Sequence, residues 1–427
     1  MSPATGPLAA PMRRRGPRPV QLHLLLAAAR AMLASLPGPS ASPISSDGWP
    51  RSKAARAEMA RIGRRLGDLA SADPRAAERF RGAVSRRLLR DDAALLAGIA
   101  AYRRHPWRRT LEDPPAIWRE GAARLLDYGG GGPCVLVVPS LVNRAHVLDL
   151  MEGASLLRHL AVAGARPLLL DWGWPGAEER ALTLTDHIAG RLERALSAAP
   201  GPVVLAGYCM GGLLALAAAL RRPDRVRALA LLATPWDFHA GEGAAQQGRA
   251  LAALLPVFEP AMEATGTLPV DAIQSLFALA DPFGLARKFR AFGRLPQAGE
   301  AAARFVALED WLNDGVPLPA HVAREAIGGW YGENAPARGA WRVAGMAVRP
   351  EALGVPAFVA IPARDRIVPP ASALALAARL PAGASIHLAP AGHVGMVAGR
   401  GAEAALWRPL LGWLHALPGP AKLPPGA

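Results

Sequence analysis

The residues with the clearest chemical meaning in this 427-residue chain surround one cysteine. Cys209 lies in GYCMG (207–211), which has the glycine-x-nucleophile-x-glycine form with cysteine in place of serine. The apolar stretch PVVLA precedes it and LLALAAALRR follows, so a buried strand is expected to turn sharply into a buried helix at the sulfur. The glycines avoid collisions beside a strained turn, and the helix N-terminus favours a thiolate. We therefore expect Cys209 to be a nucleophile.

Such a nucleophile needs a base, and the base needs a carboxylate that orients it. Asp365 follows VPAFVAIPAR and His393 follows ASIHLAPAG, so both are expected just after strands. The order nucleophile, acid, histidine is that of hydrolases with this type of turn. Asp237 in TPWDF is the alternative acid, although a cap for the helix that follows accounts better for it.

Backbone N–H groups are expected to stabilise the oxyanion that forms when the nucleophile attacks a carbonyl. One donor is expected at Met210, and the other at Leu141 or Val142 in SLVNR, the loop after CVLVVP. Backbone donors leave little side-chain signature, so this assignment rests on position alone. Cys134, which begins CVLVVP, is expected to be an inert core thiol.

Short apolar segments alternate with helical ones through the middle of the chain. The four expected strands are 134–139, 166–172, 202–208 and 226–235, and the strand pattern resumes at 355–365 and 384–393 before a final helix near 403–417. Continuous apolar strands separated by helices indicate a mostly parallel sheet covered on both faces. The predicted fold class is α/β, specifically an α/β-hydrolase fold with a helical lid inserted between strands and a helical N-terminal region.

The expected divisions of the chain follow from these patterns. They are a loosely structured segment (1–48), an N-terminal helical region (49–128), a first core part (129–237), a helical lid (238–350), a second core part (351–418) and a tail (419–427). Apolar lid residues that are expected either to line an access channel or to form ordinary lid core are Leu254, Leu255, Phe258, Leu276, Phe277 and Phe283.

Composition and charge limit the other function classes. Residues 1–128 hold 23 Lys+Arg against 11 Asp+Glu, which is most of the net charge of +15. No nucleic-acid-binding motif accompanies this charge, so a soluble arginine-rich helical layer is expected rather than a DNA or RNA partner. Two cysteines form no disulfide framework and favour a reducing, cytoplasmic location. The longest uncharged run, 195–220, contains Pro200 and several glycines, so no integral membrane segment is expected.

With these residues placed, the sequence resembles the polyhydroxyalkanoate synthases, especially the shorter type that works with a second subunit. The matching stretches occur in order over roughly 100–415: VVPSLVNRAHVLDL, LLLDWGWP, GYCMGG, LLATPWDF, LEDWLNDGVPLPAHVAREAIGGWY, RDRIVPP and AGHVG. The ordered set is much more specific than any one motif. Two departures concern Arg366, where the family usually has His, and His146, where an aromatic residue is more usual.

The resemblance implies that Cys209, Asp365 and His393 form a catalytic triad. It implies polymerisation of (R)-3-hydroxyacyl-CoA thioesters to polyester, with CoA as a leaving group and no cofactor. The implied partners are the hydroxyacyl-CoA substrate, the nascent polyester or granule surface, and either a second synthase subunit or a homodimer. Two alternatives stay open: an intracellular depolymerase or acyl-thioester hydrolase with the same triad, and a non-catalytic granule-binding protein.

Overall fold

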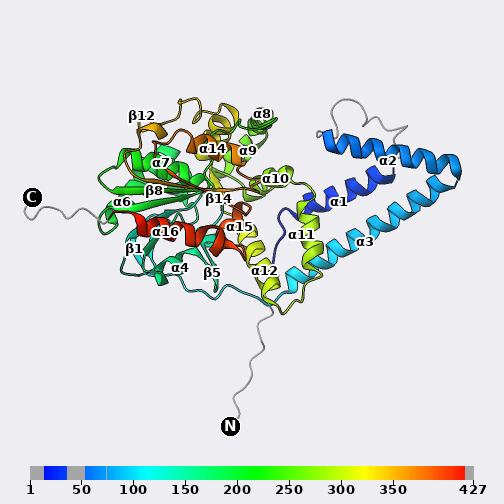
Figure 1. Ribbon diagram of the computed structural model, residues 1–427, viewed down its shortest axis with the longest axis horizontal. Coiled ribbons are helices and arrows are strands. Elements are labelled where there is room, and N and C mark those ends of the chain that lie inside the picture. The colour runs from blue at the N-terminus through cyan, green and yellow to red at the C-terminus, as the bar shows by residue number, and fades with distance from the viewer. Residues whose placement is uncertain (1–13, 36–52, 74, 419–427) are drawn as a thin grey trace, which may run out of the picture. The chain divides into compact units, whose positions relative to one another are not determined.

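The computed structural model describes residues 14–35, 53–73 and 75–418, and the chain divides into two compact units. One unit comprises residues 1–106 with 281–306, and the other comprises 107–280 with 307–427. Each unit is therefore built from segments far apart in sequence. Figure 1 shows the chain coloured from the N-terminus to the C-terminus, so the two parts of each unit can be told apart.

The larger unit is built on an eight-stranded sheet (Figure 1). In spatial order its strands are β1 (Ala116–Glu120), β2 (Ala123–Asp127), β6 (Arg166–Asp171), β3 (Cys134–Val138), β7 (Val203–Tyr208), β8 (Val226–Leu232), β13 (Ala357–Pro362) and β14 (Ser385–Ala389). The six strands from β6 to β14 run parallel, whereas β1 and β2 are antiparallel. The apolar runs expected to be strands all lie in the parallel part, which confirms the predicted fold class.

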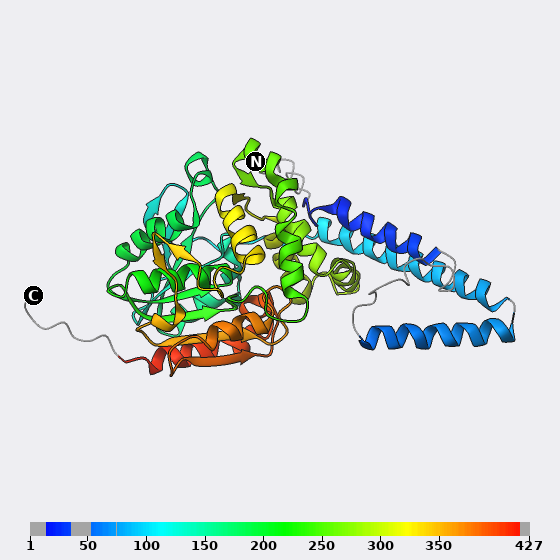
Figure 2. The ribbon, with the colours of Figure 1, turned by 90° about the horizontal axis from the view of Figure 1, so that it is seen from above.

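Helices cover both faces of this sheet. Successive side chains of a strand point to opposite faces, and because both sets are apolar, both faces must be buried. On β7, Val203 and Leu205 join one buried cluster while Val204 and Ala206 join the other. The first cluster includes residues of η3 (Asp186–Leu192), α6 (Glu193–Ala198), α7 (Met210–Arg221) and α14 (Pro370–Ala377). The second includes residues of α4 (Leu156–Val162), α15 (His393–Ala398), η6 (Glu403–Trp407) and α16 (Arg408–Ala416). Figure 2 shows the same helices from above.

Short elements and further helices fill the connections of this unit. Beside the first part of the sheet lie η2 (Ala145–Leu148), β4 (Asp149–Met151), β5 (Ala154–Ser155) and α5 (Ala177–Arg180). After β8 come α8 (Ala244–Ala252), α9 (Leu255–Thr265), β9 (Thr267–Leu268), α10 (Val270–Ala280), β10 (Leu318–Pro319), α13 (Ala320–Arg324), η4 (Glu325–Gly332), β11 (Arg342–Val343), β12 (Met346–Ala347) and η5 (Pro350–Ala352). This helix-rich insertion interrupts the sheet between β8 and β13, as the sequence predicted.

The smaller unit is helical. It contains α1 (Val20–Ser35), α2 (Lys53–Ala72), α3 (Ala76–Arg104), α11 (Gly284–Phe292) and the first part of α12 (Glu300–Asn313). Aromatic rings join its two chain segments, because Tyr102 meets Phe289 edge to face with ring centroids 5.6 Å apart. The helices α3 and α11 approach closely at Gly98, where an added Cβ would lie 2.1 Å from the carbonyl oxygen of Phe289.

Two features differ from the expected divisions. Residues 116–127, expected in the N-terminal helical region, form β1 and β2 at the edge of the sheet. Residues 281–306, expected in the lid, group instead with the N-terminal helices. Within the ranges that the structure describes, no helix is both long and apolar enough to span a bilayer.

Candidate active site

Cys209 occupies a strained turn between β7 and α7. Its φ of 57° and ψ of −127° are unusual for a residue with a side chain. The glycines around it are required by space: an added Cβ would lie 2.4 Å from Gly212 Cα if placed on Gly207, and 2.2 Å from the Val138 carbonyl oxygen if placed on Gly211. The Cys209 N–H donates to the Leu232 carbonyl at 2.8 Å, which ties the turn to β8. The backbone of this turn therefore fixes the position of the Cys209 side chain.

The two loops expected to supply oxyanion donors lie next to each other. Val138, at the end of β3, is in register with Gly207 on β7, so the loop after β3 starts beside the cysteine turn. Met210 is the first residue of α7, and a first-turn N–H has no acceptor within its own helix. The Val142 N–H donates to Ser140 Oγ at 3.0 Å, which leaves the Leu141 N–H as the remaining candidate donor of that loop.

Asp365 and His393 are joined by a hydrogen bond. The His393 Nδ1–H donates to Asp365 Oδ2 at 2.7 Å, and both side chains are buried. The other carboxylate oxygen accepts the backbone N–H groups of Ile367 at 2.8 Å and Val368 at 3.0 Å. The carboxylate is therefore held from both sides, and it fixes the ring orientation and the tautomer of the histidine.

Cys209 interacts with His393 strongly enough to raise its pKa, which completes the three-residue cluster. Burial by itself lowers the pKa of His393, but the negative charge of Cys209 and the hydrogen bonds with Asp365 and Cys209 more than offset it and raise the pKa to about 10. The imidazolium form of His393 is thus favoured. The structure brings these three predicted residues together at the carboxyl ends of β7, β13 and β14.

The alternative acid has other partners. Asp237 Oδ1 accepts the backbone N–H of His239 at 2.9 Å and the side-chain amide of Asn334 at 2.8 Å. The Asn334 amide oxygen in turn accepts the Phe238 N–H at 3.0 Å. These contacts tie the chain just after β8 to Asn334, near the end of η4. The role is structural, but it is not the predicted helix cap, because the N-cap residue of the following helix α8 is Gly243.

Two tyrosines beside the cluster were not singled out from the sequence. The Tyr208 ring lies 5.2 Å from the His393 ring between centroids, and its hydroxyl donates to the His393 carbonyl at 3.4 Å. Tyr331 comes from η4 in the insertion. Burial, with a smaller contribution from the charge of Cys209, raises the pKa of both phenols. Both hydroxyls therefore stay protonated.

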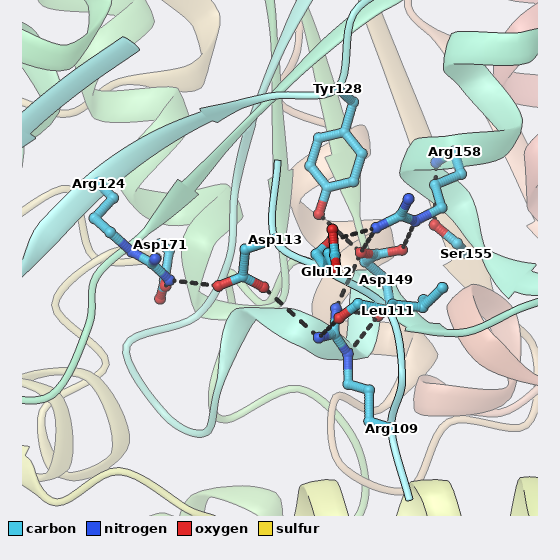
Figure 3. Close-up of polar contacts among 10 residues, drawn as sticks. All are labelled: Arg109, Leu111, Glu112, Asp113, Arg124, Tyr128, Asp149, Ser155, Arg158 and Asp171. Carbon is cyan, nitrogen blue, oxygen red and sulfur yellow. Dashed lines mark hydrogen bonds and ion pairs between the residues drawn. The ribbon is translucent and has the colours of Figure 1, made fainter. Parts of the chain in front are cut away.

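A buried ion network fixes the segment just after the β3 loop (Figure 3). Asp149, which has no exposed surface, accepts hydrogen bonds from Arg158 at 2.8 Å, from Arg109 at 3.1 Å and from the Tyr128 hydroxyl at 3.1 Å. A carboxylate buried with two guanidinium partners is favourable only as a complete set, because each missing partner leaves an uncompensated charge. The network thus holds the chain on both sides of the candidate oxyanion loop.

The same network extends to the end of β6. Arg124 donates to Asp171 at 2.6 Å and to Asp113 at 3.0 Å, and Figure 3 shows Asp113 between Arg124 and Arg109. Burial and the neighbouring Arg109 lower the pKa of His146 to about 4, so this imidazole stays neutral. Sequence reasoning missed the network because its members are single charged residues scattered over 107–171.

The remaining predicted residues have distinct positions. Burial raises the pKa of the Cys134 thiol to about 11, so it stays protonated, as expected of an inert core thiol. Leu255, Phe258 and Leu276 pack half-buried against the first core cluster. Phe283 falls in the N-terminal unit, where it lines a small cavity with His23.

Comparisons with known proteins identify the family to which the chain belongs. The family described as alpha/beta hydrolase fold matches residues 133–399. A poly(3-hydroxyalkanoate) polymerase subunit of Synechocystis is 30% identical over 274 residues, covering 61% of this chain and 72% of the relative. The corresponding subunit of Allochromatium vinosum is 28% identical over 294 residues, covering 66% of this chain and 80% of the relative.

Solved structures with similar folds were also found. An alpha/beta hydrolase fold protein from Nakamurella multipartita is 19% identical with a TM-score of 0.44, covering 71% of this chain and 99% of that protein. A thioesterase domain from the curacin biosynthetic pathway is 17% identical with a TM-score of 0.42, covering 70% of this chain and 97% of that domain.

Proposed function

Because this chain belongs to the α/β-hydrolase family and, within it, to the family of the poly(3-hydroxyalkanoate) polymerase subunits, we propose that it is an acyltransferase that polymerises (R)-3-hydroxyacyl-CoA thioesters. Cys209 is the nucleophile, His393 is the acid and base, and Asp365 orients the histidine. The observation that carries this assignment is the hydrogen bond of Asp365 with His393, together with the interaction of His393 with Cys209.

The first step transfers the acyl group to the enzyme. The Cys209 thiolate attacks the thioester carbon, and the carbonyl oxygen gains negative charge between the N–H groups of Met210 and Leu141. The bond from carbon to the CoA sulfur then breaks, and the His393 imidazolium gives its Nε2 proton to the departing thiolate. The products are CoA, an acyl-cysteine thioester and a neutral His393. CoA leaves with its sulfur protonated and serves as no cofactor.

The second step forms the ester. The hydroxyl of a second hydroxyacyl unit, or of the growing chain, gives its proton to His393 while its oxygen attacks the acyl-cysteine carbon. The carbon–sulfur bond breaks, and the thiolate of Cys209 is restored beside an imidazolium. General-base help of this kind is worth about 10²- to 10⁴-fold. Cysteine suits this step because a thioester keeps the acyl group activated, whereas a serine oxoester would lower its energy before transfer.

Partners follow from this chemistry. The substrate is a hydroxyacyl-CoA, and the product is a water-insoluble polyester whose granule surface the enzyme meets as the chain grows. A cytoplasmic, granule-associated location fits both. Both relatives are named as polymerase subunits, which supports a further partner, either a second synthase subunit or another copy of this chain.

Hydrolysis is the second candidate, because the same cluster can pass an acyl group to water. The observation that favours it is the shared triad geometry of hydrolases, in which His393 would deprotonate water instead of a hydroxyl. The two functions differ only in the acceptor. A non-catalytic granule-binding role is disfavoured, since such a role requires no buried pair of Asp365 and His393 beside a strained cysteine.

The test is a product analysis with 3-hydroxybutyryl-CoA. Released CoA, free 3-hydroxybutyrate and insoluble polymer are measured in the same reaction for the chain and for Cys209→Ala. The proposal expects one mole of released CoA for each mole of 3-hydroxybutyryl units in the polymer. The Cys209→Ala variant should form neither product. CoA with free acid would establish hydrolysis in its place, and full turnover by Cys209→Ala would exclude the nucleophile. Cys134→Ala is the matched control and should keep its activity.

A further inference from the structure

Two buried tryptophans hold the loop after β3 by its backbone carbonyls, one on each side. The Trp172 Nε1–H donates to the Pro139 carbonyl at 3.1 Å, and the Trp311 Nε1–H donates to the Arg144 carbonyl at 2.7 Å. Both indoles are buried, with 9% and 5% of their surface exposed. Leu141, whose N–H is the candidate oxyanion donor of this loop, lies between the two attachment points. The loop is thus fixed before and after that donor.

The conformation of the loop explains why such support is needed. Asn143 has a φ of 67°, which is uncommon for a residue with a side chain. A conformation of this kind persists where surrounding contacts hold it. The Gln274 side-chain amide supplies a third and weaker link, because it donates to Asn143 Oδ1 at 3.4 Å and to the Leu312 carbonyl at 2.9 Å. The loop therefore depends on bonds from other parts of the chain for its shape.

The two indoles come from different parts of the larger unit. Trp172 directly follows β6 of the sheet, whereas Trp311 lies in α12, within the insertion between β8 and β13. It belongs to the part of α12 that groups with the sheet. Its ring is in the same buried cluster as Ala145 and Val147, which come just after the loop. The insertion, and not the sheet alone, therefore determines where the loop lies.

We propose that Trp172 and Trp311 are positioning residues that hold the Leu141 N–H at the place where the oxyanion forms. The proposal rests on the proposed function in one respect, namely that the reaction passes through an oxyanion. The loop begins beside the nucleophile turn, because a Cβ on Gly211 would lie 2.6 Å from the Pro139 carbonyl oxygen. An oxyanion donor must lie about 2.7–3.1 Å from the charged oxygen, and a displacement of about 1 Å can cost about 10²-fold in rate. The indoles act through the loop and not on the substrate.

Two reactions of Cys209 separate this role from a general effect on the site. Both are measured in chains that carry Cys134→Ala, so that Cys209 is the only thiol. Alkylation by iodoacetamide joins the sulfur to a CH₂ carbon and releases iodide without forming an oxyanion. Acylation by 3-hydroxybutyryl-CoA forms one, and it is followed by rapid quench as released CoA and acyl-enzyme mass in the first turnover. Trp172→Phe and Trp311→Phe keep an aromatic ring and remove only the N–H donor. Each should slow acylation by about 10- to 100-fold and leave alkylation within about threefold.

Trp407→Phe is the matched control. Its indole is 6% exposed, and its N–H also donates to a buried carbonyl, that of Val397 at 3.1 Å, which lies on α15 and outside the loop. Both reactions should stay within about threefold of the unchanged chain. Unchanged acylation in the folded loop variants would overturn the proposal, as would alkylation slowed as much as acylation or an equal loss of acylation in Trp407→Phe.

The remaining outcomes are also decided. Circular-dichroism melting identifies variants that do not fold, and the other loop tryptophan then decides. If neither variant folds, Gln274→Met decides, with an expected loss of acylation of about 3- to 10-fold for one lost hydrogen bond. p-Nitrophenyl butyrate serves as a second acyl donor whose attack also forms an oxyanion. A chain acylated by this ester but not by the CoA thioester would remove the proposed function while the ester still tests the loop. A chain acylated by neither donor would overturn both.

Discussion

The replacement of Asp365 by Asn tests the proposed triad most sharply, because the change keeps the shape of the side chain. One oxygen of Asp365 accepts the N–H groups of Ile367 and Val368 at 2.8 and 3.0 Å, and the other accepts the His393 Nδ1–H at 2.7 Å. An asparagine has a single oxygen, and the two backbone donors hold it. Its NH₂ group therefore lies against Nδ1, where a donor now faces a donor.

The histidine resolves this conflict by moving its proton. With Nδ1 as the acceptor, the neutral ring carries its proton on Nε2, which faces the sulfur and can no longer accept a proton from a thiol or hydroxyl. The loss of the carboxylate charge also removes one of the interactions that hold the pKa of His393 near 10. In a Ser-His-Asp triad the same change lowers kcat by about 10⁴, which is about 5 kcal/mol at 1.36 kcal/mol per tenfold.

The assay separates the two chemical steps. Rapid-quench mixing with 3-hydroxybutyryl-CoA followed by intact-protein mass measurement gives the rate of acyl-Cys209 formation, and released CoA over many turnovers gives the rate of elongation. If Asp365 acts by orienting His393, both rates fall by about 10⁴-fold. Asp237→Asn is the matched control, because Asp237 also accepts two hydrogen bonds through one oxygen, and both rates should stay within about threefold of the unchanged chain.

Two results would refute this reasoning. Normal acylation with only elongation lost would mean that Asp365 acts on the attacking hydroxyl and not through the histidine. Equal damage from Asp237→Asn and Asp365→Asn would mean that the assay reports general disruption of the fold. Each variant is therefore also melted, and the comparison is made only between variants that unfold cooperatively.

Three further predictions concern stability. Gly211→Ala should lower the free energy of unfolding, measured with urea, by about 3 kcal/mol or more, because its Cβ would lie 2.2 Å from the Val138 carbonyl oxygen. Gly412→Ala is the control: a Cβ there would meet nothing within 4 Å, so the variant should be neutral or stabilising. Asp149→Ala should lower the free energy of unfolding by about 2–3 kcal/mol. This is below the usual ~3–5 kcal/mol for a broken buried pair, because Arg109 and Arg158 are partly exposed. Asp224→Ala removes an exposed ion pair and should change the stability little. The folded pKa of His393 lies above its unfolded value, so its stabilising contribution is complete below about pH 6.5 and is lost as the pH rises to about 10. The stability difference between the chain and His393→Gln should shrink over that window, and a difference that grows would contradict the raised pKa.

Local patterns predicted the part of the fold that depends on local burial. The six parallel strands are runs of apolar residues because helices cover both their faces. Each strand can therefore be recognised from its own sequence. Strands β1 and β2 lack this signature. The sequences AIWRE and ARLLD mix charged and apolar residues, so they did not stand out from the helical region before them.

The site could be predicted for those residues that directly follow a strand of the parallel sheet. Parallel strands end at the same side of a sheet, so residues just after β7, β13 and β14 are expected to meet. The role of Asp149 depends instead on Arg109 and Tyr128, 40 and 21 residues earlier, and nothing local marks such a pairing. The grouping of 281–306 with the N-terminal helices likewise depends on the contact of Phe289 with Tyr102, which only the folded chain reveals.

The discontinuous helical unit has a consequence for synthesis of the protein. About 180 residues separate the end of α3 at Arg104 from the start of α11 at Gly284. At ~5–20 residues per second, a ribosome needs about 10 to 40 s to cover that distance. During that interval Tyr102 lacks its contact with Phe289, and the side of α3 that carries Leu95, Ile99 and Tyr102 is not covered by α11. We therefore expect a chaperone to bind this apolar side of α3 until α11 has been synthesised.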